Sequence, residues 1–215
     1  MIDDESTVGD VKPTETPSFS EEGTARAGSS RVTVRAAGPA DAADLSRVAS
    51  ATFALACPPS TTQASIDDFI ATHFTETHFA GYLADPERAL FLAVADADGE
   101  SNPIGYTMVI FGEPTDTDVI AAIALHPTAE LSKVYVLAGH HGAGVAARLV
   151  EASVAAAAER GAVGIWLGVN QLNARANRFY EKSGFARVGV KRFRLGDTYE
   201  EDFVRERAID ADTIR

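Results

Sequence analysis

A glycine-rich turn, placed between a β-branched run and an alanine-rich segment, is the part of this sequence best suited to chemistry. Residues 131–137 read LSKVYVL and residues 138–146 read AGHHGAGVA. A turn of this kind presents several unbonded backbone N–H groups at a helix N-terminus, where the helix dipole also favours negative charge. The sequence therefore predicts a cradle for a phosphate or pyrophosphate group.

Two well-known phosphate-binding patterns can be compared with this turn. A nucleoside-triphosphate P-loop needs Lys and then Ser or Thr after its second glycine, but valine and alanine follow Gly144. A dinucleotide fingerprint fits better, because Gly142, Gly144 and Ala147 have its spacing. It also needs an acidic residue at the end of the next strand, and residues 169–171 (VNQ) contain none. The first pattern fails and the second is weakly supported.

A second motif follows in the order that coenzyme A binding would require. Residues 173–185 read NARANRFYEKSGF, which is similar to Asn-x-x-Ala-x-x-x-Tyr with Gly-Phe beyond. Residues 141–146 match the turn Arg/Gln-x-x-Gly-x-Gly/Ala except at His141. Together the two motifs resemble the GNAT N-acetyltransferase superfamily. Residues 130–136 and 193–197 resemble its PaiA-type branch, which is similar to spermidine/spermine N-acetyltransferases.

The resemblance covers residues 31–209 and implies an activity. The expected enzyme is an acetyl-CoA-dependent N-acetyltransferase that transfers the acetyl group directly, with no covalent enzyme intermediate, to a primary amine of a small molecule such as a polyamine. A protein or peptide N-acetyltransferase and a non-catalytic CoA-binding regulatory module stay open as alternatives. Homodimers are common in the superfamily.

The resemblance also assigns the cofactor contacts. Backbone N–H groups of the turn would hold the pyrophosphate, while the backbone of Val134 and Val136 would pair with the pantetheine arm and the acetyl carbonyl, where strands four and five splay apart. Tyr180 would be the general acid for the leaving thiolate; Asn173, Ala176 and Tyr180 share one helix face by their spacing. Without the turn, the pattern would favour Phe179 and Tyr180 as core aromatics. The implied cofactor-binding residues are Val134, Tyr135, Val136, His141, Gly142, Ala143, Gly144, Val145, Ala146, Asn173, Ala176 and Tyr180.

The ammonium form of the acceptor must lose a proton, and Glu130 is the candidate catalytic base. It precedes His141 by eleven residues, the same offset as the catalytic glutamate of histone-type members. A carboxylate that merely faces solvent or Lys133 is the equal alternative. A water relay from the second helix is a further option, although surface positions are favoured for its polar residues, which are His73, Glu76 and His78.

Histidine at position 141 departs from the family pattern. Because histidine is mostly neutral at pH 7, we expect weaker coenzyme A binding than an arginine would give. His140 and His141 do not predict a metal site, since adjacent side chains point apart and no third ligand is evident.

Composition sets the broad limits. A length of 215 residues suits one domain (30–215) after a tail (1–29) rich in Ser, Thr, Glu, Gly and Pro, which we expect to be disordered. The net charge of −12 argues against nucleic acid and anionic membranes as partners. Cys57 is the single cysteine and reads as a buried apolar thiol. With no membrane-spanning run and an acidic N-terminus, the expected location is the cytoplasm.

Hydrophobic periodicity predicts an α/β (α+β) fold, a mixed, mostly antiparallel sheet of about seven strands with helices on both faces. A helix should run from residue 39 to residue 57. A second should open at Ser65, with Asp68 closing a capping box, and extend toward Asp85. Residues 113–127 should be mostly loop. The other expected strands are 31–35, 89–95, 103–111, 131–137, 162–169, 185–195 and 198–209, and the other expected helices are 142–159 and 172–182.

Overall fold

The computed structural model describes residues 31–56, 62–97, 100–195 and 198–210. Its strands are β1 (Arg31–Ala36), β2 (Arg88–Ala97), β3 (Glu100–Phe111), β4 (Thr128–Val136), β5 (Gly164–Asn170), β6 (Ala186–Leu195) and β7 (Thr198–Ala208). Its α-helices are α1 (Ala42–Ala56), α2 (Gln63–His73), α3 (Glu76–Ala84), α4 (Thr117–Ala122), α5 (Val145–Glu159) and α6 (Ala174–Lys182), with short 3-10 helices η1 (Pro39–Asp41) and η2 (Ala138–His140). The predicted tail, Cys57 and the turn at 196–197 lie outside the described residues.

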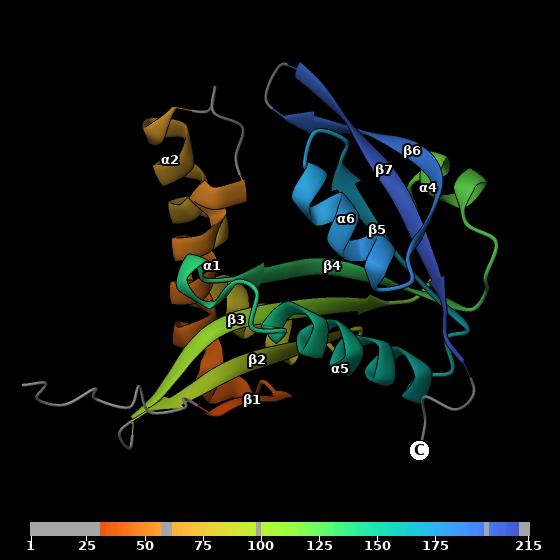
Figure 1. The fold of residues 1–215 in the computed structure, drawn as a ribbon. Helices are drawn as coiled ribbons and strands as arrows, with labels where there is room; N and C mark the ends of the chain where they lie inside the picture. The colour runs from red at the N-terminus through yellow and green to blue at the C-terminus, as the bar shows by residue number, and fades with distance from the viewer. Residues whose placement is uncertain (1–30, 57–61, 98–99, 196–197, 211–215) are drawn as a thin grey trace, which may run out of the picture.

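The strands form one seven-stranded sheet in the order β1-β2-β3-β4-β5-β7-β6 (Figure 1). Neighbouring strands are antiparallel except β4 and β5, which are parallel. The mixed, mostly antiparallel sheet predicted from the sequence is therefore confirmed. Because both faces of the central strands are covered, β2 and β3 are nearly continuous apolar runs instead of alternating ones.

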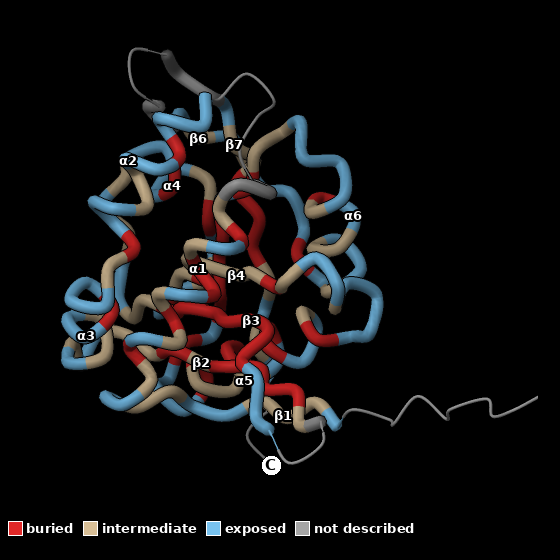
Figure 2. The backbone as a smooth tube through the Cα atoms, turned by 90° about the vertical axis from the view of Figure 1, so that its left-hand side faces the viewer, coloured by how far each residue is buried: buried red, intermediate tan, exposed pale blue. Residues whose placement is uncertain are grey.

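Helices cover both faces of the sheet, as predicted. On one face α1 and α3 pack over β2 and β3, in a cluster that includes Leu45, Phe79 and Tyr106. On the other face α5 packs over β1 to β4 and α6 lies against β6, and both helices contribute to one cluster that includes Val154 and Leu167 (Figure 1). Figure 2 shows that buried residues gather on the strands, whereas the outer turns of α3 and α6 are exposed.

The segment after α1 differs from its prediction in where the helices begin. The predicted capping box at Ser65 is wrong: α2 begins at Gln63, because the hydroxyl of Thr62 accepts a hydrogen bond from the Ser65 backbone N–H at 3.2 Å. The single long helix is also wrong. Thr75 caps a new helix, α3, by accepting from the His78 N–H at 3.3 Å, as N-cap residues do.

Residues 113–127 were predicted as mostly loop, but they contain the helix α4. Asp116 caps it, with its carboxylate accepting from the Asp118 N–H at 2.9 Å. Val119 is fully buried, and with Ile123 it packs against Trp166. A helix of six residues is too short to show periodicity, and burial of its apolar side chains stabilises it.

In the part of the chain that the structure describes, no helix has both the length and the apolar character needed to cross a membrane.

Candidate active site

The strands β4 and β5 diverge in the middle of the sheet. They pair only at residues 128–130 of β4 and 164–166 of β5, although β4 continues to Val136 and β5 to Asn170. On the other side of β4, Met108 pairs with Lys133 and Val109 with Leu131, which leaves Ser132 as an extra residue. A β-bulge of this kind bends and twists its strand. The predicted splay is thus present, and it begins directly after Glu130.

The bulge also changes which β4 side chains face which helices. Beyond Ser132, Val134 and Val136 pack on the side of α5. Lys133 and Tyr135 pair with Met108 and Tyr106 and share their face, the side of α1 and α3. The ring of Tyr135 stacks on that of Tyr106, with centroids 5.6 Å apart. Glu130, paired with Ile110 ahead of the bulge, lies on this same face.

Backbone groups of Val134 and Val136 are directed into the splay. The Leu137 N–H donates to the Ile104 carbonyl at 2.8 Å, so that residue and Tyr135 direct their backbone groups toward β3. Alternate residues of a strand direct theirs to the opposite side, which here is the side from which β5 has diverged. These two residues stand where the sequence analysis expects the pantetheine contacts.

The turn after β4 leaves the first turn of α5 without a side-chain cap. Gly142 and Gly144 have φ angles of 85° and 74°, left-handed values that glycine adopts without strain. They explain why α5 begins at Val145 instead of Gly142. The first α-helical bond runs from the Arg148 N–H to the Gly144 carbonyl at 3.1 Å, so the preceding N–H groups have no partner within the helix. Space around both glycines is open, which fits a bulky anion.

His141 folds back onto the end of β4. Its Nε2 lies 2.8 Å from the Val136 carbonyl oxygen. A carbonyl only accepts, so Nε2 is the donor and the imidazole is held against the strand. The Val136 carbonyl is therefore already engaged. Of the remaining turn residues, Ala143 is exposed and Ala146 is partly buried, while the Val145 side chain is buried.

Tyr180 extends from α6 toward the splay. Asn173 caps α6 by accepting from the Ala176 N–H at 3.0 Å, and Ala176 and Tyr180 pack in the cluster beneath the helix. The Tyr180 ring meets that of Phe185 edge to face at 5.8 Å. Burial raises the pKa of Tyr180, and the nearby phenol of Tyr135 raises it further. Tyr180 shares this cluster with Val134 of β4.

Glu130 is half-buried and lies on the face of α1 and α3 where the pairing with β5 ends. Burial lowers the pKa of Lys133, the charge of Glu130 opposes this, and Arg88 adds to the lowering. Among the described residues, Glu130 and Lys133 form no ion pair within 4 Å. The structure places the three relay candidates of the second helix at exposed positions, namely His73, Glu76 and His78.

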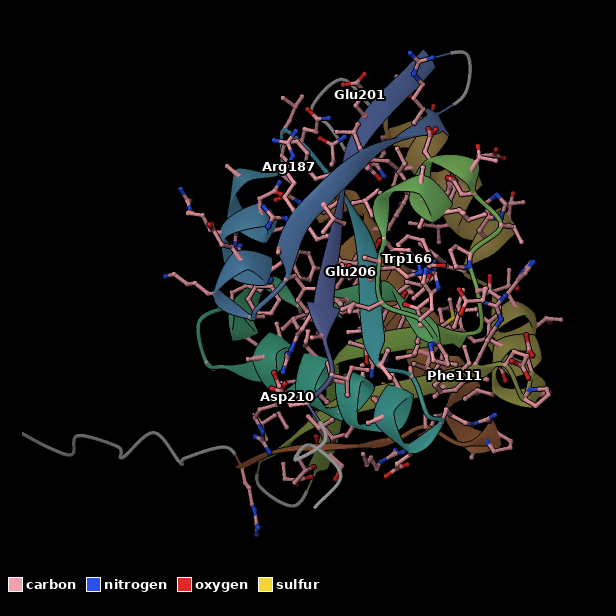
Figure 3. All side chains as sticks on the ribbon, turned by 90° about the vertical axis from the view of Figure 1, so that its right-hand side faces the viewer. Phe111, Trp166, Arg187, Glu201, Glu206 and Asp210 are labelled. Atoms are coloured by element: carbon pink, nitrogen blue, oxygen red, sulfur yellow. The ribbon has the colours of Figure 1, made fainter. Side chains whose placement is uncertain are left out.

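Sequence reasoning missed the contacts that fix the strands and α6 around this site. Glu206 of β7, beside Trp166 of β5, is buried and accepts from the backbone N–H groups of Ala124 (3.0 Å) and Leu125 (2.9 Å) (Figure 3). It thereby holds the segment that leads into β4. Asn177 and Arg205 form a second buried pair. A charged or amide side chain at an inward position was the available signal, but its partner lies far away in the sequence.

Comparisons with known proteins agree with this geometry. Residues 55–185 match the Acetyltransferase (GNAT) family. An uncharacterized N-acetyltransferase of Mycobacterium tuberculosis is 44% identical over 169 residues, which are 79% of this chain and 98% of the relative.

Two solved structures share the fold. The PaiA N-acetyltransferase of Thermoplasma acidophilum, in complex with coenzyme A, has a TM-score of 0.62 at 18% identity and covers 83% of this chain and 99% of that one. NAA60 of Arabidopsis thaliana, in complex with a bisubstrate analogue, has a TM-score of 0.63 at 14% identity and covers 84% and 100%. At these identities the likeness concerns the fold alone.

Proposed function

We propose that this chain, which belongs to the acetyltransferase (GNAT) family and is an N-acetyltransferase, transfers an acetyl group from acetyl-CoA to a primary amine of a small molecule. The observation that carries the proposal is the packing of Tyr180 from α6 in one cluster with Val134 of β4, at the splay that opens after Glu130. The first turn of α5, which has no side-chain cap, follows the end of β4 at Val136. A polyamine is the acceptor class to test first, because of the PaiA-like residues 130–136.

Acetyl-CoA supplies an acetyl thioester, and each part of the site has one task toward it. The N–H groups from Gly142 to Ala146 bind the pyrophosphate, whereas the His141 N–H donates to the Ala138 carbonyl at 3.4 Å. The backbone groups of Val134 and the N–H of Val136, which face the splay, orient the pantetheine arm and the acetyl carbonyl. A single N–H directed at the developing oxyanion contributes about 3 kcal/mol. Orientation of the amine beside the carbonyl carbon contributes the larger part of the rate.

Two side chains handle protons. Glu130 accepts a proton from the ammonium group of the acceptor, directly or through water, so that the nitrogen lone pair attacks the acetyl carbon. The carbon–sulfur bond then breaks, and the Tyr180 hydroxyl gives its proton to the leaving sulfur. The acetylated nitrogen loses its remaining extra proton to water, and the Tyr180 phenolate takes a proton back from solvent. Because its pKa is raised, Tyr180 stays a neutral donor at physiological pH. General acid–base groups of this kind contribute about 10²- to 10⁴-fold.

Release of free thiol from acetyl-CoA, measured over polyamines, amino acids and peptides, tests the proposal. We expect release with polyamines, and its loss in Tyr180→Phe but not in Tyr82→Phe, which removes a phenol from the α3 face. Release with peptides alone would support the protein-directed alternative. Tight coenzyme A binding with no thiol release for any amine would overturn the proposed catalysis and support a regulatory module.

A further inference from the structure

Asn177 of α6 and Arg205 of β7 form a buried polar pair, and Asn177 lies one helical turn before Tyr180 on α6. Their exposed fractions are 9% and 7%. The Arg205 Nε donates to the Asn177 Oδ1 at 3.1 Å, and the Arg205 Nη1 donates to the Phe185 carbonyl at 3.0 Å. The Asn177 Nδ2 donates to the carbonyls of Asn170 and Asn173, both at 3.0 Å.

These bonds join three segments that surround α6. Asn170 is the last residue of β5, Asn173 is the cap of α6, and Phe185 is the last residue before β6. Phe185 also bonds directly to Tyr180, because its N–H donates to the Tyr180 carbonyl at 2.9 Å. The Arg205 guanidinium thus bridges Phe185, which bonds to the Tyr180 backbone, and the side chain of Asn177. Asn177 lies one helical turn before Tyr180, since positions three apart are neighbours on a helix.

Burial of the Arg205 guanidinium costs desolvation free energy, which weighs against its use merely to hold a helix. Among the described residues, no carboxylate lies within ion-pair distance of Arg205. Arg187 stands opposite it on β6 and carries the same charge, although its own guanidinium lies 3.8 Å above the Phe203 ring (Figure 3). Apolar residues of similar volume often stabilise such a site equally well. What an arginine adds is the fixed direction of its hydrogen bonds.

We propose that Asn177 and Arg205 are positioning residues that set the orientation of α6, so that the Tyr180 side chain stays at the splay, in the cluster with Val134. The inference rests on the proposed function of Tyr180. It assigns the pair no contact with substrate. A displacement of a catalytic group by about 1 Å can cost 10²-fold in rate, so loss of the pair acts on kcat and leaves the binding of acetyl-CoA by the α5 turn largely intact.

A double-mutant cycle on kcat tests the pair. In the wild-type background, we expect Asn177→Ala to lower kcat by about 10- to 100-fold with less than a two-fold change in the KM for acetyl-CoA. In the Tyr180→Phe background the same substitution should have no further effect. Val94→Ala, a core truncation on β2, is the matched control for lost stability and should leave kcat unchanged below its Tm. Arg205→Lys keeps the charge but can donate to only one of the two acceptors at a time. Its kcat should lie between those of wild type and Asn177→Ala.

The outcomes separate the two ideas. Additive losses in the cycle, or a loss no larger than that of Val94→Ala, overturn the positioning role and leave Tyr180 as the acid. An unchanged kcat in Tyr180→Phe itself overturns the proposed role of Tyr180 and the inference with it. Where Asn177→Ala does not fold, Asn177→Asp keeps the acceptor for Arg205 and removes the two donated bonds, and it carries the same comparison.

Discussion

Tyr135 on β4 influences the ionisation of Tyr180 on α6 across the point where β4 and β5 part: burial raises the pKa of the Tyr180 phenol, and the phenol of Tyr135 raises it further. The two side chains come from opposite sides of the sheet, since Tyr135 packs with the α1 and α3 cluster and Tyr180 with the α5 and α6 cluster. The pairing of β4 with β5 ends at Glu130, before Tyr135 is reached. The two phenols therefore belong to different faces of the sheet, near the splay.

Alkaline unfolding should report the buried phenol of Tyr180. Its pKa is raised above the ordinary value of 10.0, so the folded state retains a proton that the unfolded state releases. The stability that this proton contributes is fully present below about pH 10 and is lost as the pH rises further. The Tm of the wild type should fall more steeply between about pH 9.5 and 11 than that of Tyr180→Phe.

Tyr82→Phe is the control for this measurement and should follow the wild-type slope. Tyr106 is fully buried and its pKa is also raised by burial, with contributions from Tyr135 and Tyr82. The Tm of Tyr106→Phe should therefore also fall less steeply with pH than that of the wild type. Equal slopes for wild type and Tyr180→Phe would mean that the Tyr180 phenol is solvated.

Local sequence was sufficient to predict the glycine turn, the helix that follows it and the face of α6 that carries Tyr180. The turn depends on residues that are consecutive in the chain, so its chemistry is readable there. The bulge at Ser132 is different, because it exists only in the register between β3 and β4, and nothing in residues 131–137 signals it. The bulge is what brings Lys133 and Tyr135 onto the face of Glu130.

Contacts between distant segments explain the remaining differences. Asn177 and Arg205 are separated by 28 residues, and neither position shows a motif, although Asn177 follows Asn173 by one helical turn. The bond from His141 to Val136 depends on a left-handed glycine conformation after it. Helix caps are different, because their signal is local: Thr62 and Asp116 are residue types that begin helices, so the starts of α2 and α4 are predictable from the sequence in place of Ser65 and of a loop.

His141→Arg should tighten coenzyme A binding. Arginine adds a permanent charge at the turn and can still donate to the Val136 carbonyl that His141 now engages. A charge at this distance from a helix terminus contributes about 0.3–1 kcal/mol, so titration calorimetry should give a Kd lower by about two- to five-fold. His140→Arg adds the same charge one residue earlier and should give the smaller gain. A Kd tighter for wild type than for His141→Arg would show that the imidazole itself contacts the ligand.

Glu206→Ala should destabilise the fold strongly. The carboxylate accepts from the backbone N–H groups of Ala124 and Leu125, and at 7% exposure water replaces it poorly. Each unsatisfied buried group costs about 1–3 kcal/mol, so urea unfolding should show a loss of about 2–6 kcal/mol. Glu206→Gln keeps one acceptor oxygen and should lose less. Glu201→Ala, at an exposed position on the same strand, is the control. If it lost as much unfolding free energy as Glu206→Ala, the anchoring role of Glu206 would be contradicted.

Glu130→Gln should lower kcat/KM for an alkylamine acceptor at neutral pH and recover as the pH rises. The glutamine keeps the size and the half-buried position of the side chain on the face of α1 and α3, but it cannot accept a proton from the ammonium group. We expect a loss of about 10²-fold at pH 7, which shrinks as the pH approaches the amine's own pKa, where the acceptor arrives uncharged. Glu76→Gln, at an exposed position on α3, should match wild type throughout. A loss that is constant with pH would make Glu130 a binding residue for the acceptor's charge, and no loss at any pH would return it to the alternative of a carboxylate that only balances Lys133.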